Sequence, residues 1–233
     1  MRRIFWASDS TVQTNKIFTY PQTGIGQELY RYLKDDVLVV NRARNGRSTK
    51  SFMTEGRLER IEEEIENGDF LFIQFGHNDE KKDDPARYTE PFSSFIENLE
   101  IYICVARVHG AYPVLITPLE RRCFVDEEHL GKGDHSDYVE AIKQTAKKDD
   151  VALIDLYGMS RAAMEKAGKS GSRQWYMNFD KGIYDNYPDG KDDNTHLRYE
   201  GAVMYAGLVA KGLEELGGIY KDLLTSKEEE EAK

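Results

Sequence analysis

Short apolar runs alternate along the chain with longer stretches of amphipathic pattern. Five runs rich in β-branched, aliphatic and aromatic residues predict strands at 3–7, 37–41, 70–75, 112–116 and 152–156. Their nearly continuous apolar character is typical of strands that are covered by helices on both faces. The alternation itself indicates βαβ units around a parallel sheet.

The segments between these runs carry apolar residues at helical spacing. One helix face is marked by Leu58, Ile61 and Ile65, and a second by Phe92, Phe95, Ile96, Leu99 and Ile103. Further helices are expected over 134–148 and 199–216. We assign these stripes to core packing. The expected fold is α/β: a three-layer α/β/α sandwich with a five-stranded parallel sheet of the flavodoxin-like type.

No internal repeat and no Pro/Gly-rich linker divides the chain, so one domain is expected over 1–225. Residues 170–195 fit neither period and are expected to form a long loop, which contains aromatic side chains among Gly, Asp and Asn. A loop of this length is usually functional or disordered, and the aromatic residues favour function. The acidic segment 226–233 is expected to be a disordered tail.

The charge count excludes several classes of protein. With 32 Lys and Arg against 42 Asp and Glu, the net charge is −10, which argues against nucleic acid or an anionic membrane as the main partner. The longest apolar run, 101–106, is too short to span a bilayer. The first residues lack the apolar core of a secretory signal, so a cytoplasmic location is expected. The sequence does not indicate the oligomeric state.

The cysteines and the acidic residues give no metal or disulfide pattern. Cys104 lies in an apolar helical stretch and is expected to be a core residue, and Cys123 has no metal-ligand spacing to it. Acidic residues crowd 185–193, but the third and twelfth positions of a calcium loop would fall on Tyr187 and His196. We therefore expect no metal and no cofactor.

Four polar blocks follow strands or precede the last helix, where ligands of parallel sheets bind. They read S-D-S-T at 8–11, N-G at 45–46, G-H-N-D at 76–79 and D-N-T-H at 193–196. Each block alone is an ordinary turn or helix cap. Together they provide a serine nucleophile, an imidazole with a carboxylate three residues before it, and a glycine N–H and an asparagine amide as donors to an oxyanion.

Rival assignments exist for most of these roles. Ser8 is a second hydroxyl near Ser10, and Asp192 is a second carboxylate before His196. His77 and His135 are rival bases, but neither has a carboxylate three residues before it, which favours contacts to a loop or to substrate. Asp9 and Asp79 are expected to accept hydrogen bonds from loop N–H groups.

Over nearly its whole length, the order of these blocks resembles the SGNH (GDSL-type) hydrolases. The D-S-T, F-G-H-N-D, I-T-P-L-E-R-R and D-N-T-H segments are most similar to rhamnogalacturonan acetylesterases and related bacterial carbohydrate acetylesterases. The glycine that usually opens the first block is Ser8 here. The resemblance implies a catalytic triad of Ser10, Asp193 and His196, and an oxyanion hole of Ser10, Gly46 and Asn78.

The expected activity is removal of O-acetyl groups from plant cell-wall oligosaccharides, with rhamnogalacturonan fragments as the leading substrate. Alternatives are an acetylxylan or other sugar acetylesterase, a thioesterase or lysophospholipase of the same superfamily, and a non-catalytic flavodoxin-like binding protein. Residues 39–51 contain four bases and no acid, so an anionic sugar remains compatible with the acidic chain. Candidate substrate contacts are Arg44, Arg47, His77, Arg121, His135, Trp175, Tyr184 and Tyr187.

Overall fold

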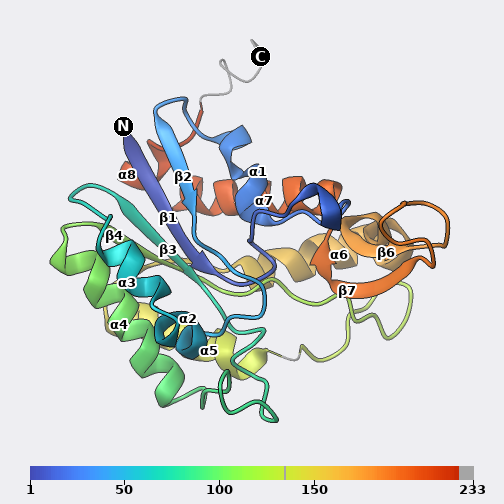
Figure 1. The fold of residues 1–233 in the computed structure, drawn as a ribbon, viewed down its shortest axis with the longest axis horizontal. Coiled ribbons are helices and arrows are strands. Elements are labelled where there is room, and N and C mark those ends of the chain that lie inside the picture. Colours follow the sequence, from blue (N-terminus) through green and yellow to red (C-terminus); the bar gives the residue numbers. More distant parts are fainter. Residues whose placement is uncertain (134, 226–233) are drawn as a thin grey trace.

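The five predicted strands form one parallel sheet in the computed structural model, which describes residues 1–133 and 135–225 (Figure 1). The sheet order is β2-β1-β3-β4-β5. The strands are β1 (Arg2–Ser8), β2 (Val37–Asn41), β3 (Phe70–Gln74), β4 (Tyr112–Ile116) and β5 (Ala152–Ile154). The last strand is shorter than predicted because Asp155 caps a helix, its side chain accepting a hydrogen bond from the Gly158 amide.

Helices cover both faces of the sheet. One face carries α2 (Thr49–Thr54), α3 (Arg57–Glu62), α4 (Ser94–Val108) and α5 (Ser136–Lys148), and the other carries α1 (Ile25–Glu28), α6 (Leu156–Ser172) and α7 (Tyr199–Leu216) (Figure 1). The short α8 (Gly218–Lys221) follows α7, and three 3₁₀ turns lie at Ile17–Thr19 (η1), Leu29–Tyr32 (η2) and Arg173–Trp175 (η3). The expected three-layer sandwich is confirmed.

Alternate side chains of each strand supply the two cores. On β1, Ile4 and Trp6 pack with α1 and α7, whereas Phe5 and Ala7 pack with α2 to α5. All four are fully buried. Burial of apolar surface at about 25 cal/mol per Å² on both faces fixes the sheet between the helices. This framework holds the loops at the carboxyl ends of the strands.

Residues 170–195 do not form the expected long loop. They contain the end of α6, η3, and an antiparallel hairpin of β6 (Tyr176–Phe179) and β7 (Lys191–Leu197). Helix α6 itself was not predicted, because its buried positions Leu156, Ser160, Met164 and Ser172 include two serines and give no apolar stripe. At Gly168, with φ +72°, the helix is kinked.

Two further expectations about α4 are wrong. Phe92 precedes the helix and is 52% exposed, and Cys104 is exposed, as is Cys123. Cys104 lies between the buried residues Ile103 and Val105, but the face that packs on the core is set by Leu99, Ile103 and Ala106 at helical spacing. The predicted tail at 226–233 and Asp134 lie outside the described residues.

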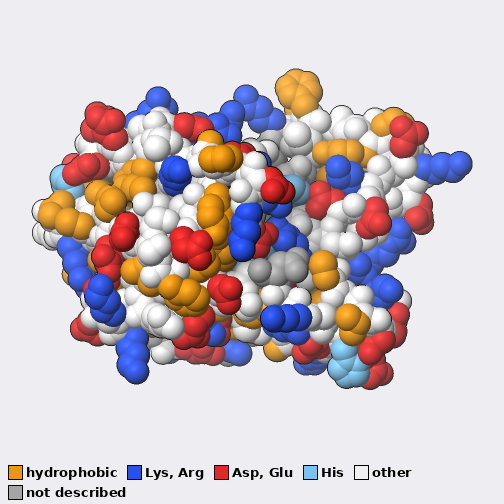
Figure 2. All heavy atoms as spheres, turned by 90° about the horizontal axis from the view of Figure 1, so that it is seen from below, with side chains coloured by type: hydrophobic (Ala, Val, Ile, Leu, Met, Phe, Trp, Pro, Cys, Tyr) orange, Lys and Arg blue, Asp and Glu red, His pale blue; other side chains and the backbone are white. Residues whose placement is uncertain are grey.

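The surface of the described residues mixes charges of both signs. Seen from below relative to Figure 1, basic side chains gather near the middle of the molecule (Figure 2).

Along the described chain, no helix combines the length and the apolar character needed to cross a membrane.

Candidate active site

A pocket of about 470 Å³ lies where segments after β1, β2 and β3 meet the β6–β7 hairpin. It brings together all five residues predicted for the triad and the oxyanion hole. The lining residues are Ser10, Gln22, Asn45, Gly46, His77, Asn78, Lys81, Arg87, Arg121, Met177, Tyr187, Lys191, Asp193, Thr195 and His196.

Ser10 lies in a tight turn directly after β1. The buried Asp9 carboxylate accepts hydrogen bonds from the Thr11 amide and hydroxyl, at 2.9 and 2.8 Å. Burial raises the pKa of Asp9, although the hydrogen bonds from Thr11 oppose this. The rival Ser8 is fully buried, and its hydroxyl donates to the Gln74 carbonyl oxygen at 2.6 Å. The turn therefore presents Ser10, and not Ser8, to the pocket.

His196 connects Ser10 to a carboxylate. Its Nδ1 lies 2.8 Å from Asp193 Oδ2, and its Nε2 lies 2.9 Å from Ser10 Oγ. Because a carboxylate only accepts hydrogen bonds, Nδ1 carries the proton and Nε2 is left with a lone pair toward the serine. The three side chains therefore form a continuous chain from carboxylate to hydroxyl.

A distortion of β7 creates this geometry. The adjacent residues Tyr176 and Met177 on β6 pair with Leu197 and Asp193, so residues 194–196 bulge out of the ladder. The bulge is held by Asp193 Oδ1, which accepts the amides of Thr195 and His196, both at 3.0 Å.

The charge of Asp193 is stabilised where it lies. Burial raises its pKa, but the hydrogen bond and charge of His196 and the two amides outweigh this effect and lower the pKa to about 2. The rival Asp192 points elsewhere, since its Oδ1 accepts a hydrogen bond from Asn178 at 3.0 Å. Strand alternation separates the two carboxylates, and only Asp193 faces the imidazole.

Three potential donors to an oxyanion belong to residues that line the pocket: the backbone amides of Ser10 and Gly46 and the side-chain amide of Asn78. Among the described residues, the backbone amides of Ser10 and Gly46 have no hydrogen-bond acceptor. Gly46 has φ +76°, a conformation that glycine adopts without strain. The Asn78 amide nitrogen donates to the Arg47 carbonyl oxygen at 3.1 Å and makes a long 3.5 Å contact to Asp9.

Asn78 is oriented by its surroundings. Arg87 donates to its side-chain oxygen at 3.2 Å, which fixes which end of the amide is the donor. The turn before it is tight: Gly76 has φ +144°, and a Cβ there would lie 3.0 Å from Pro118. A side chain at position 76 would therefore strain the turn that leads to Asn78.

His77 and His135 are both buried beside the pocket, with ring centroids 4.3 Å apart. Burial, followed by the electrostatic effect of His135, lowers the pKa of His77 well below 6.5, which favours the neutral form of its ring. His135 Nδ1 contacts Glu80 at 2.7 Å, and the other carboxylate oxygen of Glu80 pairs with Arg121 at 2.7 Å. Among the described residues, His196 forms a hydrogen bond with Ser10, whereas His77 and His135 form none with it.

Three of the eight predicted substrate contacts line the pocket: His77, Arg121 and Tyr187. The other five, Arg44, Arg47, His135, Trp175 and Tyr184, do not. Arg47 is paired with Glu55 at 2.8 Å. The ring of Trp175 packs near that of Tyr205 in the core.

Sequence reasoning missed several lining residues, above all Lys81, Arg87 and Lys191. Their only signal was proximity to a motif, since Lys81 follows the G-H-N-D block and Lys191 lies two residues before Asp193. With Arg121 they place four cations in the pocket. The pocket is therefore locally basic in a chain of net charge −10.

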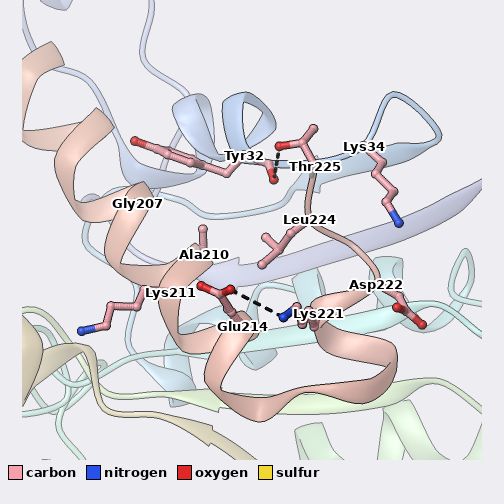
Figure 3. Close-up of a pocket in the computed structure, with 10 residues that line it drawn as sticks. All are labelled: Tyr32, Lys34, Gly207, Ala210, Lys211, Glu214, Lys221, Asp222, Leu224 and Thr225. Atoms are coloured by element: carbon pink, nitrogen blue, oxygen red, sulfur yellow. Dashed lines mark hydrogen bonds and ion pairs between the residues drawn. The ribbon is translucent and has the colours of Figure 1, made fainter. Parts of the chain in front are cut away.

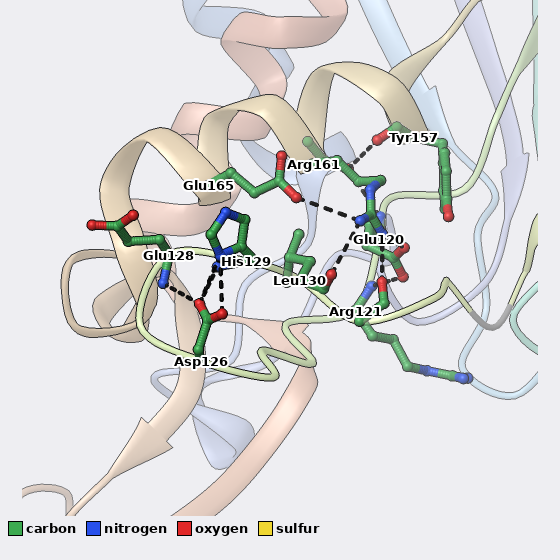
Figure 4. Close-up of polar contacts among 11 residues, drawn as sticks. Glu120, Arg121, Asp126, Glu128, His129, Leu130, Tyr157, Arg161 and Glu165 are labelled. Atoms are coloured by element: carbon green, nitrogen blue, oxygen red, sulfur yellow. Dashed lines mark hydrogen bonds and ion pairs between the residues drawn. The ribbon is translucent and has the colours of Figure 1, made fainter.

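An ion pair between the buried Glu120 and the partly exposed Arg161 holds the segment that carries Arg121. Glu120 is 2% exposed; its carboxylate pairs with Arg161 at 2.8 Å and accepts the Arg121 amide at 2.8 Å (Figure 4). Arg161 also donates to the Gly131 carbonyl oxygen at 3.1 Å. These bonds fasten the stretch after β4 to helix α6.

A second pocket lies between η2, α7 and α8 (Figure 3). It contains none of the predicted site residues, and Lys221 and Glu214 form an ion pair of 3.6 Å across it. In the part of the chain that the structure describes, no three His, Cys, Asp or Glu side chains are grouped so as to hold a metal ion.

Two proteins of Bacillus subtilis are similar to this chain over nearly its whole sequence. The chain is 42% identical over 231 residues to rhamnogalacturonan acetylesterase RhgT of Bacillus subtilis, covering 98% of this chain and 97% of that protein. It is 44% identical over 214 residues to the probable rhamnogalacturonan acetylesterase YesY of the same organism, covering 92% and 93%.

Solved structures of other proteins have the same fold. The crystal structure of Bacillus subtilis YxiM matches with a TM-score of 0.78 at 27% identity, over 93% of this chain and 57% of that one. The acetylxylan esterase Axe2 of Geobacillus stearothermophilus shares the fold, with a TM-score of 0.62 at 13% identity over 97% of each chain. The model of the GDSL-like lipase/acylhydrolases matches residues 9–206. With this match over most of the chain, the protein belongs to the GDSL-like lipase/acylhydrolase family.

Proposed function

We propose that this protein is a serine esterase that removes O-acetyl groups from rhamnogalacturonan fragments through an acetyl-enzyme intermediate. The observation that carries the proposal is the hydrogen-bonded series from Asp193 through His196 to Ser10. It ends in a pocket where the backbone amides of Ser10 and Gly46 have no acceptor among the described residues. The names of the relatives at 42% and 44% identity support the substrate.

In the first half-reaction, Ser10 Oγ attacks the acetyl carbonyl carbon while His196 Nε2 takes the hydroxyl proton. The negative charge of Asp193 stabilises the imidazolium that forms. As the tetrahedral intermediate collapses, the ester C–O bond breaks, and His196 delivers the proton to the sugar oxygen that leaves.

In the second half-reaction, water attacks the acetyl-enzyme and gives its proton to His196. Collapse of the second tetrahedral intermediate releases acetate and returns the proton to Ser10 Oγ. The charged oxygen of both intermediates is assigned to the amides of Ser10 and Gly46 and to the side-chain amide of Asn78. Because the two backbone donors have no acceptor among the described residues, they need no rearrangement to bind it.

The lining of the pocket favours a small acyl group on a polar alcohol. Met177 and Tyr187 are its only large apolar side chains among the described lining residues, and the rest are polar, charged or glycine. A long acyl chain of a thioester or lysophospholipid would need a larger apolar surface. Acetyl esters of sugars fit this lining better.

The test is acetate release from acetylated rhamnogalacturonan, pectin and xylan oligosaccharides, with octanoyl esters as the long-chain comparison. We expect the highest kcat/KM on rhamnogalacturonan fragments and loss of all acetate release in Ser10→Ala. Preference for octanoyl esters, or a Ser10→Ala variant as active as the wild type, would contradict the proposal. Ser8→Ala is the matched control. It should keep most of the activity, because the Ser8 hydroxyl donates to the Gln74 carbonyl oxygen and Ser8 does not line the pocket.

A further inference from the structure

Two lysines, Lys81 and Lys191, line the pocket that contains Ser10. The ammonium groups of Lys81 and Lys191 make no ion pair or hydrogen bond with the described residues. Both side chains are exposed. The other two cations of the pocket are held in place: Arg87 pairs with Asp84 at 2.6 Å, and Arg121 pairs with Glu80.

Each lysine is tied by the backbone to a residue of the proposed catalytic machinery. The Lys81 amide donates to the Asn78 carbonyl oxygen at 3.3 Å, which closes a turn on the asparagine. Lys191 lies two residues before Asp193 on β7, so both side chains point to the same face, about 7 Å apart along the strand. Lys191 is therefore placed on the same side of β7 as Asp193, and Lys81 closes the turn that carries Asn78.

The charge balance of the pocket calls for an anion. Among its described lining residues, Asp193 is the one carboxylate, and it is committed to His196. The arginine charges are offset by Asp84 and Glu80, whereas no carboxylate of the described residues pairs with Lys81 or Lys191. A negative group beside these two lysines would therefore be stabilised. Flexible lysine stems suit contacts to carboxylates whose position varies along a polymer.

We propose that Lys81 and Lys191 bind carboxylate groups of the substrate, so that the enzyme selects acetyl esters carried on, or next to, an anionic sugar. This inference rests on the proposed acetylesterase function and adds the residues that read substrate charge. Arg44 and Arg47, the cations that the sequence singled out, are not part of this arrangement, because they do not line the pocket.

The experiment compares kcat/KM on three acetyl esters: acetylated rhamnogalacturonan oligosaccharides, neutral acetylated xylo-oligosaccharides and p-nitrophenyl acetate. We expect Lys81→Gln and Lys191→Gln each to lower kcat/KM on the anionic oligosaccharide about tenfold, mainly through KM. Rates on p-nitrophenyl acetate should stay within about twofold, and Lys191→Arg should restore most of the loss. Raising the salt concentration should reduce the preference of the wild type for the anionic substrate.

Lys82→Gln is the matched control, because it removes the same charge from the next residue, which lies on a neighbouring pocket. Equal losses in Lys82→Gln and Lys81→Gln, or equal losses on neutral and anionic esters, would overturn the inference. If the wild type releases acetate from sugars and both lysine variants behave as wild type, only the inference fails. If the wild type hydrolyses p-nitrophenyl acetate but no sugar ester, the proposed function fails as well.

Discussion

Replacing Asp193 by Asn tests how the imidazole is oriented. The amide keeps an oxygen that can accept the backbone N–H groups of Thr195 and His196, so the bulge of β7 should survive. It replaces the other oxygen, 2.8 Å from His196 Nδ1, by a donor. The histidine then accepts at Nδ1 and carries its proton at Nε2, where it can no longer take the proton of Ser10.

The structure sets the size of this effect. Lowering the pKa of Asp193 from 3.8 to about 2 corresponds to roughly 2 kcal/mol in favour of the charged carboxylate. An amide forfeits that interaction and also fixes the wrong tautomer, for which a loss of about 10⁴ in kcat is typical. KM should change little, because the aspartate is assigned no contact with substrate.

The same pKa shift predicts a dependence of stability on pH. Because the folded state lowers the pKa, the carboxylate stabilises the fold above pH 3.8, and this contribution is lost as the pH falls toward about 2. The difference in unfolding free energy between the wild type and Asp193→Asn should therefore shrink over that range. Denaturant unfolding at pH 5 and pH 2.5 measures it.

The assay is hydrolysis of p-nitrophenyl acetate at pH 7, with thermal unfolding as the check on folding. Asp192→Asn is the control, since it makes the same chemical change on the neighbouring residue, which bonds Asn178 and not the imidazole. It should keep its activity within about twofold of the wild type. A rate within tenfold of wild type for Asp193→Asn would refute the assignment, as would an equal loss in both variants.

Three other changes probe the surroundings of the site. Asn78→Ala should fold and lose about 10²–10³ in kcat, and a near-wild-type rate would remove it from the oxyanion hole. Burial raises the pKa of Asp79 to about 7, so the carboxyl ionises at lower pH in the unfolded chain and the stability of the fold should fall as the pH rises from about 4 to 7. In melting curves, Asp79→Asn should not show this fall in Tm. A parallel fall in both proteins would contradict the pKa shift. Arg161→Met leaves the Glu120 carboxylate buried without its cation, which should cost about 3 kcal/mol and lower Tm by roughly 6–12 °C; an unchanged Tm would show that the pair is not stabilising.

The strands and the blocks that follow them could be predicted because their signals are local. A parallel strand with both faces covered must be apolar at consecutive positions, as at 70–73, and the polar residues that follow such a run mark its end. Helix α6 lacked such a signal, since its buried positions include Ser160 and Ser172 and its kink lies at Gly168. The exposed Cys104 shows the same limit, because an apolar stretch does not specify which helix face meets the core.

The predicted triad residues were identified by their types and order, but their geometry depends on an unpredicted hairpin. Asp193 was expected in a loop, whereas it lies on β7, where it pairs with Met177 and holds the bulge that turns His196 toward Ser10. No local pattern signals this bulge, because the partner strand begins at Tyr176, 17 residues before Asp193 in the chain.

The sequence by itself determined the class of fold, the order of the strands along the chain and the residues able to perform acyl transfer, because apolar periodicity and polar blocks act over a few residues. Tertiary structure decided which cations face the pocket: Lys81 and Lys191 line it, whereas Arg47 does not and forms an ion pair with Glu55. It also separated Asp193 from Asp192 and Ser10 from Ser8. The physical reason is that charge pairing, burial and side-chain direction depend on elements brought together only by folding, which neighbours along the chain do not specify.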